Sequence, residues 1–497
     1  MPIEPQNKPN YESNAYKSMT SAWTVVSDVS GGTARMRECS ATYLPQEPAE
    51  RPESYNRRLA RSVFFNAFNR ILDALVGMVH KADPELGDDV PEEIKKHLEN
   101  IDLAGSHLDP FLKELFTDAV RDGHAFILVD MQPALPANAT RADEIAQGRR
   151  PYWVKYKANQ AKNWRTTVVN GETILSQITF EEKTNESDGE YGEKEVCRYR
   201  VFKLESGLVK WALYRKVVQV GTKEETFIEE GSGTVNNQTR IPVAVVYGNR
   251  LGMLVSSPPL LDLAYLNIAH WQEYSDYRNI LHIAQVPLLA RIGANQDQQK
   301  VEIGVGSTLD VETGGDVKWI EIHGNGVTAA RTELQDIEQR MALMGLSMLS
   351  QKADSNVTAT EIRSNNLQES SDLATMARSE QDGAEMALEF HAKYLNLPSG
   401  GSLKLGVAES DVVLDAVMVT AVSNLVSKGQ LTLETFLNLL QRGLPGVELQ
   451  DELKKLEAEA VKSAANGPNV AKAGIQGAPP GIKDLFGAQP KANGALV

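Results

Sequence analysis

The sequence has few of the residues from which disulfides and metal centres are built. Only two of its 497 residues are cysteines, and Cys39 and Cys197 stand far apart without forming a CxxC pair. No Cys/His cluster has zinc-ligand spacing, so the sequence predicts two buried, inert thiols in a reducing compartment. No apolar run reaches the ~18 residues that a membrane span requires. The polar N-terminal stretch predicts no signal peptide.

Motifs for catalysis and cofactor binding are also missing. The sequence contains no GxxxxGK[ST], no GxGxxG after a strand, no HExxH and no GxSxG. The eight histidines are scattered, and His270 and His282 are too far apart for a metal pair one helical turn apart. Paired carboxylates such as Asp88 and Asp89 stand in polar, loop-like contexts typical of solvated charge. We therefore expect a protein that is not an enzyme and has no catalytic, cofactor-binding or metal site.

Positive charge is in deficit. The chain has 51 Lys and Arg against 66 Asp and Glu, a net charge of −15. A protein that grips DNA needs many cations facing phosphates, so we do not expect specific DNA binding. A channel through which DNA slides remains compatible, because a repulsive wall prevents sticking.

One basic run is interleaved with aromatic residues. It comprises Arg149, Arg150, Lys155, Lys157, Lys162 and Arg165, with Tyr152, Trp153, Tyr156 and Trp164. Such a run can stack on single-stranded nucleic acid. In so acidic a chain, a strand with one aromatic face packed inside and one cationic face in water is favoured. A contact with an acidic neighbouring subunit is a further alternative.

The N-terminal half predicts helices followed by strands. At 497 residues, of which 42% are hydrophobic, the chain is globular but too long for a single core. Residues 1–50 are polar and predict irregular structure. Apolar residues at helical spacing predict a helix from Ser54 through Val79, and further helices are expected over 91–100 and 109–122. Asp109 is the expected N-cap of the last helix, with Pro110 at its first position.

The middle of the chain has the sequence pattern of an antiparallel sheet. Residues 125–129 predict a buried strand, and 151–250 consist of short β-rich runs separated by turn sequences. Asn170-Gly171 stands between two such runs and predicts a hairpin.

Helices return after residue 257. One is expected over 258–284, with Trp271, Tyr274 and Tyr277 forming a buried or inter-subunit stripe, and another over 329–350. Between them, 285–327 holds β-like pieces and many glycines. The apolar spacing of 329–350 fits a short coiled-coil seam and plain helix packing equally well.

The remaining residues predict one very long helix and a tail. After a polar break at 351–356, Thr358-Ala-Thr-Glu361 forms a capping box, and the helix can continue to Leu397, which is about 58 Å at 1.5 Å per residue. Amphipathic helices are expected over 411–465. From Asn466 onward Gly, Ala, Pro and Asn dominate, which predicts disorder.

This order of elements resembles the portal proteins of tailed bacteriophages, over residues 10–465. Several short segments resemble one branch of that family: Tyr43–Pro45, Tyr55–Leu59 with the helix through Gly77, Arg150–Trp153, Asn163–Arg165, Ser275–Asn279 continuing to Pro287, and Val357–Glu361. No single motif is decisive, and their shared order carries the resemblance.

The resemblance implies an α+β portal-protein fold with an α/β wing, two stem helices, a small β-containing clip, a long helix and an α-helical crown. The implied regions are an irregular N-terminal arm (1–50), the wing with helices and antiparallel β region (51–257), the first stem helix (258–284), the clip (285–327), the second stem helix (328–350), the tunnel loop (351–357), the long helix returning to the wing (358–410), the crown (411–465) and a disordered tail (466–497).

The resemblance also implies a function and partners. Such proteins form a usually dodecameric ring at one capsid vertex, assembled in the host cytoplasm, through which double-stranded DNA passes non-specifically during packaging and ejection. The implied partners are the terminase large subunit, a head-completion or adaptor protein, and the major capsid and scaffold proteins, with no membrane. The ATPase belongs to the terminase, which agrees with the absence of a phosphate-binding loop here. The tunnel-loop candidates that face DNA are Gln351, Lys352, Asp354, Ser355 and Asn356.

Three other functions compete with this interpretation. Another structural head or adaptor protein would lack paired stem helices around a clip. A cytoplasmic multidomain enzyme would be a stable monomer with a ligand-dependent melting temperature. A single-strand nucleic-acid binder would lose salt-sensitive binding on charge reversal of Lys155 and Lys157.

Overall fold

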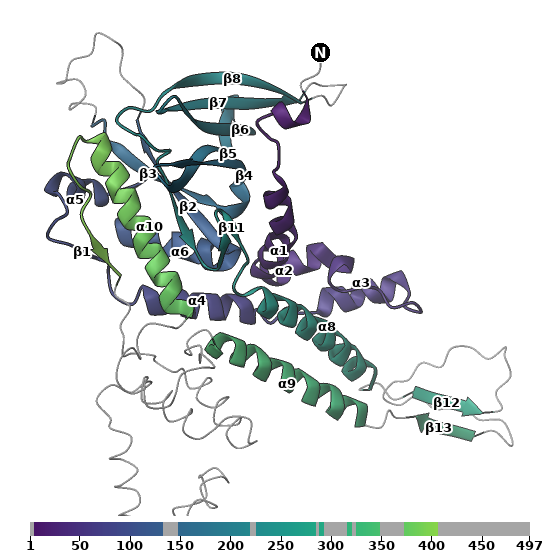
Figure 1. Cartoon of the computed structure of the whole chain (residues 1–497). Coiled ribbons are helices and arrows are strands. Elements are labelled where there is room, and N and C mark those ends of the chain that lie inside the picture. Colours follow the sequence, from purple (N-terminus) through teal and green to yellow (C-terminus); the bar gives the residue numbers. More distant parts are fainter. Residues whose placement is uncertain are drawn as a thin grey trace, which may run out of the picture. The chain divides into compact units, whose positions relative to one another are not determined.

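The chain has a mixed α+β fold with antiparallel sheets. The computed structural model describes residues 4–132, 148–218, 225–284, 288–292, 316–320, 325–347 and 372–405. The chain divides into two compact units, the first comprising Met1–Val76, Pro84–Gln351 and Asp372–Leu405, and the second Gly77–Asp83, Lys352–Ser371 and Gly406–Val497. Within the described residues, the second unit contributes only 77–83, so the architecture below is that of the first (Figure 1).

The N-terminal region is helical, and the prediction of irregular structure over 1–50 is wrong there. After a 3-10 turn at Pro5–Asn7, α1 spans Asn14–Ser30 and α2 spans Gly32–Cys39. The Ser13 side chain caps α1 by accepting from the Tyr16 N–H at 3.1 Å. The apolar residues recur at helical spacing and are buried: Tyr16, Met19, Trp23, Val26 and Val29. The sequence of this region shows the helical spacing of these apolar residues, although most of its other residues are polar.

The single helix predicted from Ser54 to Val79 is two helices. α3 spans Pro52–Arg61, and α4 spans Ala67–Val79. In the break between them, the buried Asn267 side chain on α8 (Leu261–Ala284) donates to the Phe65 carbonyl at 2.7 Å. The break therefore depends on a residue about 200 positions away, which helical periodicity does not reveal.

A three-stranded antiparallel sheet forms the centre of the first unit. Its order is β3 (Pro151–Lys157), β2 (His124–Met131) and β9 (Val243–Tyr247). The predicted strand at 125–129 is confirmed, and all five of its residues are buried. Two helices pack against this sheet, α6 (Leu108–Asp122) and α10 (Asp372–Tyr394). A continuous buried run such as that of β2 is what a strand covered on both faces requires.

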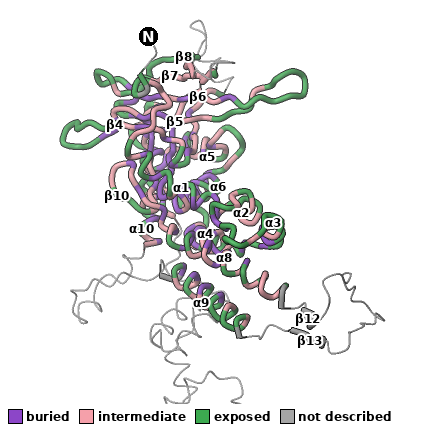
Figure 2. The backbone as a smooth tube through the Cα atoms, turned by 90° about the vertical axis from the view of Figure 1, so that its right-hand side faces the viewer, coloured by how far each residue is buried: buried purple, intermediate pink, exposed green. Residues whose placement is uncertain are grey.

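A second antiparallel sheet has five strands, which lie side by side in the order in which they occur in the chain. Its strands are β4 (Ala161–Val169), β5 (Glu172–Asp188), β6 (Gly192–Glu205), β7 (Leu208–Val218) and β8 (Glu225–Thr234). The predicted hairpin is confirmed, because Asn170 and Gly171 form the turn with φ of 52° and 81°. The far end of the β5–β6 hairpin is exposed (Figure 2). The β-rich prediction for 151–250 is thus confirmed in the described residues.

Aromatic side chains join the two sheets. Phe126 on β2 contacts Phe180 on β5 edge to face, with ring centroids 5.3 Å apart. Tyr156 on β3 stacks on the same ring at 4.1 Å. All three side chains are buried, so this cluster connects the sheets through their cores.

Short elements complete the unit. α5 (Glu92–Leu98) and α6 confirm the two helices expected there, although the N-cap of α6 is His107 rather than Asp109. The small elements are the 3-10 turns Ser40–Thr42 and Ala158–Gln160, and the pairs β1 (Glu85–Leu86) with β14 (Leu403–Lys404) and β10 (Arg250–Gly252) with β11 (Val255–Ser256).

The two helices expected after residue 257 are present. α8 begins a few residues later than predicted, and α9 (Asn325–Ser347) begins earlier. Between them the described residues form two strands, β12 (Leu288–Ile292) and β13 (Asp316–Ile320). Among the described helices, none is long and apolar enough to cross a bilayer.

Part of the range predicted for the long helix is described. α10 lies inside the predicted 358–397 range and ends at Tyr394, three residues before the predicted end. The Leu397 N–H then donates to the Ala392 carbonyl at 2.9 Å, which turns the chain before Pro398. The capping box at 358–361, the tunnel loop, the crown and the tail lie outside the described residues.

Candidate functional site

The helices α8 and α9 pack side by side and run in opposite directions (Figure 1). His270, fourteen residues before the end of α8, lies 3.2 Å from the Glu338 carboxylate, thirteen residues after the start of α9. The α9 side of the pair has apolar residues at helical spacing, and Leu334, Ile337 and Met341 are buried. At 24 and 23 residues, the two helices are each about 35 Å long.

The pair ends in two paired strands. β12 and β13 are antiparallel, with Leu288 opposite Ile320 and Ile292 opposite Asp316. The chain therefore leaves α8, passes through β12 and β13, and returns along α9 (Figure 1). A two-stranded sheet is marginally stable alone in water.

The predicted aromatic stripe of α8 divides into a buried and a partly exposed part. Trp271 is fully buried and meets Phe64 edge to face at 6.2 Å. Tyr274 stacks on the His270 ring at 6.1 Å, and both Tyr274 and Tyr277 keep partial exposure. Tyr265 is 52% exposed on the same helix. Trp271 thus anchors α8 inside the unit.

A buried arginine, Arg58, connects α3 to α8. The Arg58 guanidinium, 4% exposed, donates to both carboxylate oxygens of Glu50 at 2.9 and 2.8 Å. It also reaches Ser275 at 3.3 Å and Asp276 at 3.5 Å on α8. Hydrogen bonding to Glu50 raises the pKa of Arg58, and the same contact lowers the pKa of Glu50. The bidentate geometry gives the helix junction a defined orientation.

The ion-pair partners and the burial of the basic–aromatic run show which interpretation of it holds. Lys155 pairs with Glu114, Lys157 lies 4.0 Å from Asp118, and Lys162 lies 3.0 Å from Glu181. Trp153 and Tyr156 are buried, which leaves neither ring open for base stacking. The strand interpretation is therefore correct for the buried aromatic face, whereas the cationic face lies against carboxylates of the same chain rather than in water. These three lysines are neutralised within the chain rather than by nucleic acid.

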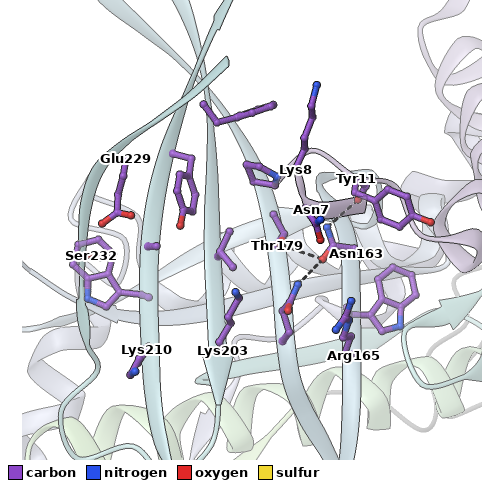
Figure 3. A pocket seen from close by; sticks show the side chains of 18 of the residues that line it. Asn7, Lys8, Tyr11, Asn163, Arg165, Thr179, Lys203, Lys210, Glu229 and Ser232 are labelled. Atoms are coloured by element: carbon purple, nitrogen blue, oxygen red, sulfur yellow. Dashed lines mark hydrogen bonds between the residues drawn. The ribbon is translucent and has the colours of Figure 1, made fainter. Parts of the chain in front are cut away.

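The five-stranded sheet carries a groove of about 770 Å³ that sequence reasoning missed. The N-terminal segment lies along one side of it, where the Asn163 side chain donates to the Tyr11 carbonyl at 2.9 Å. The Asn163 oxygen accepts from Gln177 at 3.1 Å and from Thr179 at 3.2 Å (Figure 3). This amide network holds the floor of the groove.

Cations form a row across the same face. Register places Gln177 between Arg165 and Lys203, and Lys203 opposite Lys210. The three cations lie in one row across the strands (Figure 3). The Ser206-Gly207 turn, with φ of 52° and 78°, is the sequence signal that could have predicted the Lys203–Lys210 pairing.

The histidines form no metal centre in the described ranges. No group of three His, Cys, Asp or Glu side chains there is arranged to hold an ion. His97 and His391 contact each other, and burial lowers the pKa of His391 to about 3. Cys39 and Cys197 are free and partly exposed, so the prediction of two buried thiols is wrong. Partial burial of each thiol still raises its pKa.

The predicted tunnel-loop residues cannot be assigned to this site. Gln351, Lys352, Asp354, Ser355 and Asn356 lie outside the described residues. The described residues of this site are the α8–α9 helix pair, the β12–β13 strand pair and the contacts of Arg58 between α3 and α8.

Comparison with known proteins gives one family match and distant structural likenesses. Residues 259–395, less than half of the chain, match a family described as "Domain of unknown function (DUF4055)". No curated protein matches. Among solved structures, a chain in the neck of an empty gene transfer agent (GTA) particle is 11% identical with a TM-score of 0.35, covering 77% of this chain and 90% of that chain.

Two further structures are similar to the same degree. A chain in the virion of the native GTA particle is 10% identical with a TM-score of 0.36, covering 83% of this chain and 99% of that chain. A chain in the neck of the native GTA particle with C12 symmetry is 12% identical with a TM-score of 0.31, with the same coverage. TM-scores of this size do not establish a common fold.

Proposed function

We propose that this chain is the subunit of a portal-type ring, a structural protein of a phage-like particle through which double-stranded DNA enters and leaves. The observation that carries the proposal is the antiparallel α8–α9 pair ending in the β12–β13 strands. This arrangement fits two stem helices around a clip. It also separates the proposal from an adaptor protein, which would lack such a pair.

The small size of the strand pair and the length of the two helices support assembly into a ring. A sheet of only two five-residue strands is marginally stable alone in water. Neighbouring copies in a closed ring would cover such strands and the exposed sides of two helices about 35 Å long. The pair is therefore best explained as a part completed by other subunits.

The channel lining and the partners follow from the resemblance. Residues 351–356 are polar and connect α9 to the segment before α10, which suits a wall that touches DNA without gripping it. Lys352 is the phosphate-attracting group there. The terminase would dock on the clip during packaging, and a head-completion protein would replace it afterwards, while the subunit itself performs no chemistry.

The mass of the assembled protein tests this function. Twelve copies of a 54.6 kDa chain give about 655 kDa, which native mass spectrometry and sedimentation resolve from a monomer. The proposal expects a discrete ring of about this size, alone or with a scaffold protein. A monomer that stays monomeric with scaffold, and whose melting temperature rises with a small-molecule ligand, would instead indicate an enzyme.

A further inference from the structure

A small basic cleft lies where the end of α3 meets the C-terminal half of α8. Its volume is about 110 Å³, and its lining includes Arg58, Arg61 and Arg278 together with His282 and Asn279. No carboxylate lines it, and Leu281 is its apolar member. Cations that converge on one cleft repel each other, and a bound anion relieves that repulsion.

The charges in the cleft are unequally compensated. Arg58 is neutralised by Glu50 at 2.8 Å and lies 3.5 Å from Asp276. Arg61 and Arg278 are exposed, and within the described residues neither has a carboxylate at ion-pair distance. Neither of these two guanidinium charges is therefore neutralised by a carboxylate of the described residues.

The position of these arginines at a helix end does not account for the arrangement. Arg61 stands in the last turn of α3, where a cation complements the helix dipole. Arg278 stands more than a turn before Ala284, the last residue of α8, and gains nothing from that dipole. A helix-end effect explains one of the two cations and leaves their convergence unexplained.

We propose that this cleft binds a phosphate group. Guanidinium groups present N–H donors in a fork that matches phosphate oxygens, and Asn279 adds a neutral amide beside them. Two open positive charges match a phosphate dianion, whereas a carboxylate supplies one negative charge. Each water molecule occupies about 30 Å³ in the liquid, so a 110 Å³ space has room for a group with four oxygens.

Thermal unfolding in different anions tests the site on the intact protein. Inorganic phosphate should raise the melting temperature by about 1–3 °C over chloride or acetate at equal ionic strength. Arg61→Gln and Arg278→Gln should each remove this shift. Arg57→Gln is the matched control, because Arg57 is an exposed arginine on α3 that does not line the cleft, and it should keep the shift.

Two arms identify the source of the phosphate. A blunt 30-base-pair duplex without terminal phosphates that binds wild type more tightly than Arg278→Gln indicates phosphodiesters. Binding of inorganic phosphate without such a difference indicates a free phosphate or a small ester. Equal stabilisation by phosphate, acetate and chloride overturns the proposal. The anion shift is measured independently of ring formation, so either proposal can fail alone.

Discussion

The Nδ1 atom of His97 on α5 lies 3.0 Å from the Nε2 atom of His391 on α10. The indole N–H of Trp153 donates to Nδ1 of His391 at 3.3 Å. His391 therefore accepts at Nδ1 and donates from Nε2, which leaves His97 as an acceptor at Nδ1. This chain of contacts joins α5, α10 and β3 and requires both rings to be neutral.

Acid should therefore destabilise this junction. Burial lowers the pKa of His97 and lowers that of His391 to about 3, so the unfolded chain binds more protons than the folded chain below pH 6.5. Stability is fully present above pH 6.5 and falls as the pH drops toward 3. The urea midpoint should decline between pH 6.5 and 5.5, and His391→Gln should flatten that decline. His107→Gln, at an exposed histidine, is the control and should leave the slope unchanged.

Removing one partner of the Arg58–Glu50 pair should be costly. Arg58→Ala leaves the largely buried Glu50 carboxylate without its bidentate donor, so the free energy of unfolding should fall by about 3–5 kcal/mol. Chemical denaturation measures the loss. Arg57→Ala on the exposed side of α3 should change stability by less than about 0.5 kcal/mol. Equal small effects in both variants would show that the α3–α8 junction does not depend on this pair.

Substitution by alanine at two helical glycines should change the stability of the protein in opposite directions. A Cβ at Gly383 on α10 would lie 2.7 Å from Val246 of β9, so Gly383→Ala should destabilise by about 1–3 kcal/mol. At Gly77 on α4 a Cβ would meet nothing within 4 Å in the described residues, so Gly77→Ala should stabilise by roughly 0.5–1 kcal/mol. Melting temperatures of the two variants compare them directly. A stabilising Gly383→Ala would contradict the close packing of α10 on β9.

Deleting residues 351–356 separates channel function from assembly. If these residues form a wall that touches DNA, the deletion variant should assemble with the mass of wild type. Packaging or DNA retention, measured as nuclease-protected DNA per particle, should fall several-fold. Loss of assembly itself would refute the tunnel-loop assignment, and unchanged retention would show that the segment does not touch DNA.

Local sequence patterns predicted most of the described strands and helices. The Asn170-Gly171 hairpin, the buried run at 125–129 and the helices of the α8–α9 pair all follow from periodicity and turn chemistry. These features need only neighbours in sequence. The order of elements could therefore be predicted without a structure.

Features that depend on distant partners could not be predicted. The break between α3 and α4 requires Asn267, and the pairing of Lys162 requires Glu181. The helix α1 was missed because its polar composition outweighed a periodic set of buried residues around Trp23. The groove and the basic cleft arise from strand register and helix packing, which bring Arg61 and Arg278 together across more than 200 positions.

Negative-stain electron microscopy of the purified protein tests the central claim most directly. The portal proposal predicts closed rings of about twelve subunits with a central hole wide enough for duplex DNA, when the protein is alone or mixed with its scaffold. Rings of neighbouring size with such a hole would also agree. Compact single particles without a hole under both conditions would contradict the ring, and with it the proposed role of the α8–α9 pair.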